Sequence, residues 1–208
     1  MRLTNFRTHV QALKDSASTF DNHWHYLYRR HARWHGVSNK QIIISQIFTV
    51  VASVAAGLLL DITKEGLAVL VGGLLLLPGI IDLAASLTGA MSAKIHHRLD
   101  TTDVPAWLVV VNAVLFAMFV GILAGAMVGV AGGVIGVLFF GAAFSKMVLL
   151  AVVSMGIIGF ISYPLMALFV LLLRRLGINP DNVAGPVENS VVDMVAIVVV
   201  AGVARLLV

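Results

Sequence analysis

Five long apolar runs restrict the class of fold that this chain can adopt. A helix needs about 20 predominantly apolar residues to cross the hydrocarbon core of a bilayer. The sequence predicts five such spans, which cover approximately residues 42–60, 66–95, 106–128, 147–173 and 187–207. Residues 129–145 form a glycine-rich apolar connection, predicted to link the third and fourth spans or to re-enter the membrane. The prediction is therefore an all-α polytopic membrane protein with five transmembrane helices.

The composition agrees with this class and excludes others. Charged residues make up 12% of the chain, whereas a soluble domain carries roughly 25%. The absence of cysteine excludes disulfides, thiolate metal sites and nucleophilic thiols. The net charge of +4 does not indicate nucleic-acid binding, because half of the Lys and Arg residues precede the first apolar run. No nucleophile–base pair or phosphate-binding loop is present, so the chain is not predicted to be an enzyme.

The distribution of basic residues predicts an orientation. Of the 14 Lys and Arg residues, seven lie before the first span, two between the second and third spans and two after the fourth. Three remain for the opposite side, so the positive-inside rule places the N-terminus in the cytoplasm. We expect the plasma membrane as the location, and the N-terminus is not a cleavable signal peptide, because residues 1–40 lack an apolar core.

Residues 1–40 are predicted to be a cytoplasmic segment, separate from a pore domain at 41–208. Residues 21–36 are rich in Trp, Tyr, Arg and His. Aromatic and basic side chains favour the headgroup zone, so an interfacial amphipathic helix that binds anionic lipids is expected here. A regulatory metal site at its histidines is the alternative. His96 and His97, with Asp100 and Asp103, are predicted to form a solvated loop.

Two carboxylates inside predicted spans point to function. Asp82 lies in the second span and Asp193 in the fifth. An ionised Asp at the centre of a span costs about 2.5 to 3.5 kcal/mol on insertion scales, so it needs a wet cavity, a partner or an ion. Pro78, Asp82 and Ser86 follow one another at intervals of four and share a helical face. Pro78 is expected to bend the second span.

The fifth span carries a polar stripe at its predicted cytoplasmic end. Asn189, Ser190 and Asp193 follow Pro186, the predicted helix bend, at spacings of three, four and seven. This pattern is typical of one end of a pore or of a binding pocket. Four further residues are assigned to the cytoplasmic mouth: Asp181, Asn182, Glu188 and Asn112. For Asn112 an interhelical hydrogen bond is the alternative role.

These candidate ligands are hard oxygen donors. Carboxylate, amide and hydroxyl oxygens fit Mg²⁺, Ca²⁺ or Mn²⁺ better than Zn²⁺ or Cu²⁺. A sparse site suits Mg²⁺, which is usually held by one or two carboxylates and retained waters. The prediction is transport of a divalent cation, Mg²⁺ before Mn²⁺ or Co²⁺, at a metal site of Asp193, Asp82, Asn189, Ser190 and Ser86. Proton transport by an isolated Asp is the alternative.

Two segments resemble a known family. Residues 177–186, followed by Asn189, Ser190 and Asp193, resemble the last-span signature of the MgtE magnesium transporters and their animal solute-carrier relatives; residues 78–82 resemble the second-span motif. The resemblance implies a single five-span half of a dimeric pore, lined by spans two and five of both chains, with Asp193 as the principal Mg²⁺ ligand.

The chain departs from that family pattern at one place. Residues 84–86 read Ala-Ala-Ser, where members of the family usually carry Gly-Gly-Asn or Arg-Gly-Asn. No second five-span unit is present in the sequence, so a shared pore requires either a homodimer or a heterodimer with a homologous half. The substituted triplet leaves open a second hypothesis, in which the chain is a non-transporting subunit or scaffold that supports a homologous transporter half.

Overall fold

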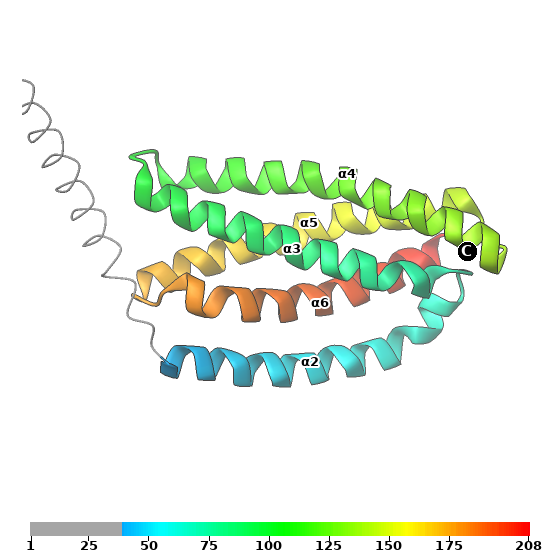
Figure 1. The fold of residues 1–208 in the computed structure, drawn as a ribbon, viewed down its shortest axis with the longest axis horizontal. Helices are drawn as coiled ribbons and strands as arrows, with labels where there is room; N and C mark the ends of the chain where they lie inside the picture. The colour runs from blue at the N-terminus through cyan, green and yellow to red at the C-terminus, as the bar shows by residue number, and fades with distance from the viewer. Residues whose placement is uncertain (1–38) are drawn as a thin grey trace, which may run out of the picture. The chain divides into compact units, whose positions relative to one another are not determined.

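The structure, a computed structural model, describes residues 39–208, which form a bundle of five long helices (Figure 1). In chain order they are α2 (Asn39–Ala68), α3 (Gly73–Thr101), α4 (Ala106–Phe140), α5 (Phe144–Arg175) and α6 (Pro180–Leu206). Each is long and apolar enough to cross a membrane, which confirms the prediction of an all-α five-span protein. The predicted interfacial helix at residues 21–36 lies outside the described residues, and Lys40, the last residue of the predicted cytoplasmic segment, belongs to α2.

The helices run alternately up and down the bundle. α2, α4 and α6 begin at the same end at which α3 and α5 finish (Figure 1). We call this the Pro180 end, after the first residue of α6. Of the described basic residues that the positive-inside rule assigns to the cytoplasm, Lys40, Arg98, Arg174 and Arg175 lie at or near this end.

The first two helix boundaries differ from the prediction. α2 continues to Ala68, through a charged stretch that was expected to end the first span. An exposed ion pair accompanies it, in which Lys64 Nζ lies 2.6 Å from Asp61 Oδ1. The break falls instead at Gly72, whose φ of 85° is left-handed and favours glycine. α3 runs on to Thr101, so the predicted loop at His96 to Asp100 is wrong: these residues are helical.

The predicted connection at residues 129–145 is wrong, because α4 continues without interruption to Phe140. A stripe of three glycines at intervals of four, Gly121, Gly125 and Gly129, lies on the face that packs against α5. A Cβ at Gly125 would lie 2.7 Å from Met155 Cγ, and one at Gly129 would lie 2.8 Å from Val148 Cα. The glycine stripe therefore permits close packing of two helices within one chain. The helix ends before Gly141, which has a φ of 66°.

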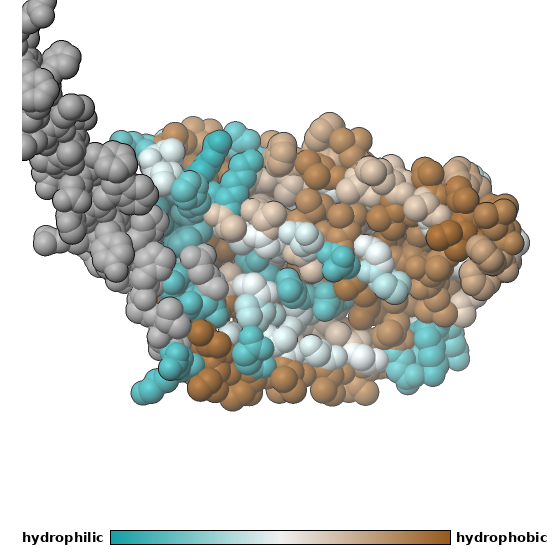
Figure 2. All heavy atoms as spheres, viewed as in Figure 1, coloured by the Kyte–Doolittle hydropathy of each residue, from teal (hydrophilic) through white to brown (hydrophobic). Residues whose placement is uncertain are grey.

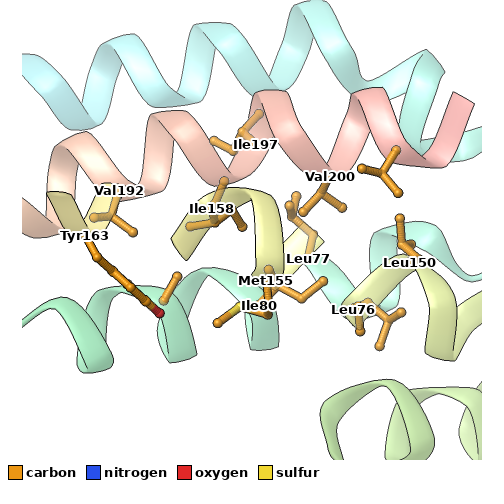
Figure 3. Close-up of a cluster of buried hydrophobic side chains, with 14 of the residues drawn as sticks. Leu76, Leu77, Ile80, Leu150, Met155, Ile158, Tyr163, Val192, Ile197 and Val200 are labelled. Carbon is orange, nitrogen blue, oxygen red and sulfur yellow. The ribbon is translucent and has the colours of Figure 1, made fainter. Parts of the chain in front are cut away.

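Helices α3, α5 and α6 enclose the core (Figure 3). The close-up shows Ile80 of α3, Ile158 of α5 and Val192 of α6 among its apolar side chains, and all three are fully buried. α6 lies between α3 and α2 in Figure 1. Since the core side chains occupy the inner faces of α3 and α6, residues on their outer faces remain available for a site.

α6 begins seven residues earlier than predicted, at Pro180 rather than Val187, so Pro186 lies inside the helix. Proline lacks an N–H and cannot bond the carbonyl four residues before it, here that of Asn182. This carbonyl accepts a hydrogen bond from Ser45 Oγ of α2 at 3.3 Å. Ser45 is 2% exposed. The bond therefore joins α2 to α6 at a carbonyl that the proline leaves without a helical donor.

Candidate cation site

Asp82 and Asp193 lie together, although 111 positions separate them in the sequence. With Asn189 they line a hollow of about 460 Å³ between α3 and α6. The remaining walls come from Leu60 of α2 and from four residues of α3: Leu77, Pro78, Ile81 and Ala85. The hollow thus presents two carboxylates and one amide against apolar walls.

Helical spacing explains why these side chains converge. Asp82 follows Pro78 by four residues on α3, and Asp193 follows Asn189 by four residues on α6. Residues four apart lie on one helical face. The opposite faces are occupied by fully buried core residues such as Ala84. Burial of the apolar faces therefore turns both polar faces outward, toward the same side of the bundle.

The polar faces form a band on the surface. Figure 2 shows hydrophilic residues along the middle of this side, over α3 and α6, with apolar bands over α2 and α4. Asp82, Ser86 and Asn189 are exposed and Asp193 is half-buried. Isolated carboxylates facing lipid are unfavourable. A polar band on the surface of a membrane-spanning bundle therefore requires a cover other than lipid.

The hollow includes only some of the predicted ligands. Ser86 is exposed one turn beyond Asp82 and lies outside the walls. Ser190 is 2% exposed, and its Oγ donates a hydrogen bond to the carbonyl oxygen of Pro186 at 3.1 Å. Its hydroxyl points into the bundle and satisfies its own helix. Asn112 lines a separate hollow of about 730 Å³ with Arg98 and Phe116. The structure separates these three residues from the two carboxylates.

The residues assigned to the mouth also have distinct surroundings. Asn182 is half-buried at the Pro180 end, and its Nδ2 donates a hydrogen bond to Gln41 Oε1 of α2 at 3.4 Å. Glu188 is fully buried, and its Oε1 accepts a hydrogen bond from Ser92 Oγ at 2.6 Å. The side chain of Asp181 lies outside the described part of the structure.

A cluster that the sequence did not reveal joins α3 to α5 at the same end. Arg174 Nη2 donates to Asp100 Oδ1 at 2.7 Å, and Arg174 Nη1 lies 2.7 Å from His96 Nδ1. The Arg174 and Asp100 side chains are 18% and 15% exposed. His96 and Asp100 were assigned to a solvated loop between two spans, and nothing in the sequence marked Arg174 as their neighbour.

The donors of the hollow suit a hard cation that retains water. No Lys or Arg lines the hollow, so its carboxylates are not neutralised from within it. Among the described side chains, which leave out Asp181, no three His, Asp or Glu residues are grouped closely enough to hold a metal. Mg²⁺ does not need such a cage, because one or two carboxylates and several waters suffice. The two carboxylates and the amide of one chain are thus oxygen donors of the kind that a hard, hydrated cation accepts.

Comparison with known proteins bears on what this hollow does. The family model of MgtE, described as a divalent cation transporter, matches residues 77–203. No curated protein matches the chain. The matched region runs from the first turns of α3 to the last turns of α6, and it contains both carboxylates of the hollow. It also spans more than half of the 208 residues. The chain belongs to the MgtE family of divalent cation transporters.

Proposed function

We propose that the chain conducts Mg²⁺ across the membrane, with Asp193 as the main ligand and Asp82 and Asn189 beside it. The observation that carries this proposal is the convergence of these three side chains on one hollow without a basic residue. Asp193 is half-buried and Asp82 exposed, so a cation at Asp193 is the better shielded from bulk solvent. Electrostatic attraction is stronger where water is partly excluded.

The proposed pore is shared by two copies of the chain. A second copy that packs on the polar band would cover Asp82 and bring two Asp82 and two Asp193 residues to one path. α3 and α6 of both copies would line it. A homodimer is the simplest arrangement, and a homologous half in place of the second copy is the other. Symmetric self-association is the commonest form of assembly among soluble oligomers.

The proposed ion is Mg²⁺, with Mn²⁺ and Co²⁺ as competitors. Mg²⁺ dehydrates reluctantly and accepts a site with few protein ligands. Mn²⁺ and Co²⁺ accept oxygen ligands as well, and Co²⁺ binds most donor sets more tightly than Mn²⁺ does. We expect all three to be transported in competition, and no transport of Ca²⁺, which prefers six to eight oxygen ligands.

We also propose that the Pro180 end faces the cytoplasm of a plasma-membrane protein. Arg98, Arg174 and Arg175 lie at or near this end, whereas Lys146 and Arg205 lie at the other. With the N-terminal basic residues the imbalance follows the positive-inside rule. Residues 1–40 would then lie at the inner membrane surface, on anionic lipid, as a segment separate from the pore domain at 41–208.

The test is flux from the purified chain in liposomes. Wild type should take up Mg²⁺ above empty vesicles. Asp193→Asn should slow uptake by more than about tenfold, because changes even in the outer shell of metal sites cost about 10- to 100-fold. Asp61→Asn is the matched control, since Asp61 is an exposed carboxylate on α2 paired with Lys64. Full uptake by Asp193→Asn would remove Asp193 from the mechanism.

A second candidate function rests on the substituted triplet. Ala84 is fully buried and Ser86 lies outside the hollow, so the triplet adds no ligand to it. A triplet without an ion ligand is what we expect of a subunit that does not transport ions itself but supports a complete homologous half. If the purified chain alone moves none of Mg²⁺, Mn²⁺ and Co²⁺ above empty vesicles, the supporting-subunit function replaces the homodimeric transporter.

A further inference from the structure

Glu188 is the most deeply buried charged residue of the described chain, with no exposed surface. It lies one residue before Asn189 but points in another direction, about 100° around the helix, where it meets Ser92 of α3. Its Oε1 accepts the hydrogen bond from Ser92 Oγ at 2.6 Å. Its Oε2 has no hydrogen-bond partner among the described residues. A buried carboxylate oxygen without a partner is strongly unfavourable, so this atom indicates a missing partner.

A second hollow lies beside this carboxylate. It measures about 190 Å³ and is separate from the hollow at Asp193. Four small residues from the two helices line it: Gly89 and Ala93 of α3, and Ala184 and Gly185 of α6. The absence of large side chains keeps the space next to Glu188 open. The hollow is large enough to hold several waters, which Mg²⁺ usually retains when it binds to protein.

The charges around this second hollow favour a cation. Arg174 of α5 contacts His96 and forms an ion pair with Asp100 at 2.7 Å, so its charge is balanced outside the hollow. His96 lines the hollow. A guanidinium only donates hydrogen bonds. The Nδ1 atom of His96, 2.7 Å from Arg174 Nη1, is therefore placed to accept from it. Glu188 Oε2 has no basic partner among the described residues, so a bound cation is the partner that this oxygen lacks.

We propose that Glu188 and Ser92 form a second cation site, which binds a hydrated divalent cation of the Mg²⁺ class through Glu188 Oε2 and retained waters. The inference rests on the proposed transport function, because its ligand is the transported kind of ion. Glu188 precedes Asp193 by five residues, about 7.5 Å along a helix. The site lies nearer the Pro180 end than Asp193 does, and it holds the ion before or after passage.

Binding of Mn²⁺ to the purified full-length protein tests the proposal, with free Mn²⁺ measured by electron paramagnetic resonance. Glu188→Gln keeps the shape of the side chain and an oxygen for the Ser92 hydrogen bond, but removes the charge. This variant should bind one Mn²⁺ fewer per chain than wild type, or bind that Mn²⁺ with an affinity at least tenfold lower. Asp193→Asn should retain the same Mn²⁺. Wild-type binding by Glu188→Gln would overturn the inference.

Ser92→Ala and Ser154→Ala provide a second, independent comparison. Each removes a buried hydroxyl, but Ser154 lies on α5 away from the second hollow. Ser92→Ala should lower the affinity for the Mn²⁺ that depends on Glu188, whereas Ser154→Ala should leave this affinity unchanged. Equal Mn²⁺ affinity in the two variants would contradict the inference. The outcomes separate the two proposals. If Glu188→Gln binds Mn²⁺ like wild type while Asp193→Asn slows Mg²⁺ flux, the second cation site is rejected and the transport function is supported.

Discussion

Three consecutive residues of α6 have three different surroundings. Glu188 is fully buried beside Ser92, Asn189 is exposed in the hollow of Asp193, and Ser190 is buried with its hydroxyl on Pro186. A helix rotates by about 100° per residue, so neighbours in sequence diverge in direction. The sequence grouped Asn189 with Ser190 because they follow Pro186 by three and four residues. Which of them lines the hollow depends on where the core lies.

This difference predicts that only one of two adjacent substitutions changes the dependence of flux on Mg²⁺ concentration. Asn189→Ala removes an oxygen from the hollow and should raise the Mg²⁺ concentration for half-maximal flux by about five- to tenfold, equivalent to about 1 to 1.4 kcal/mol. Ser190→Ala removes a hydroxyl bonded to its own helix and should leave that concentration unchanged. The measurement is concentration-dependent uptake into liposomes. An equal shift in both variants would place Ser190 at the ion.

At the scale of helices, the sequence predicted number and order well and boundaries poorly. Apolar runs identify spans because every backbone N–H and C=O group in lipid must be hydrogen-bonded, and a helix achieves this within one segment. For the same reason α4 continues through Gly129 to Phe140, although its glycine content had suggested a connection there. Pro186 likewise suggested the start of a helix, although α6 begins at Pro180. The contact between Ser45 and the carbonyl of Asn182 depends on which helices are neighbours, which no local pattern reveals.

The packing of α4 on α5 is open to a direct test with two glycines. A Cβ at Gly129 would lie 2.8 Å from the Val148 backbone, whereas one at Gly57 of α2 would meet nothing within 4 Å. Gly129→Ala should destabilise the protein by about 1 to 3 kcal/mol, the usual cost of overpacking. Gly57→Ala should leave stability unchanged or raise it by up to about 1 kcal/mol, through helix propensity. Thermal unfolding in detergent compares them.

At the scale of the whole molecule, the two halves of the family signature meet in space. Residues 78–82 of α3 and 186–193 of α6 are far apart in sequence, and each alone is a short polar interruption of a span. Their convergence at one hollow follows from the packing of α3 and α6 around a common core. The resemblance of the sequence to MgtE implied that spans two and five line a pore. Glu188 was assigned to the cytoplasmic mouth, but nothing in the sequence marked Ser92 as its partner.

The proposed dimer has a test that the composition makes simple, since the chain contains no cysteine. Ser86→Cys places one thiol on the exposed polar band of α3, one turn beyond Asp82. If two copies cover this band, the two thiols should face each other across the pore and join in a dimer under mild oxidation or with a short membrane-permeant bismaleimide. Electrophoresis without reductant measures the product.

Leu168→Cys is the matched control, because Leu168 is 62% exposed on α5 and lies outside the polar band. It should remain monomeric under the same treatment, since lipid rather than a second chain would surround it. Cross-linking of both variants to the same extent would indicate random collision. A dimer joined at Leu168 but not at Ser86 would place the interface on α5, and the carboxylates of the two copies would then not share a path.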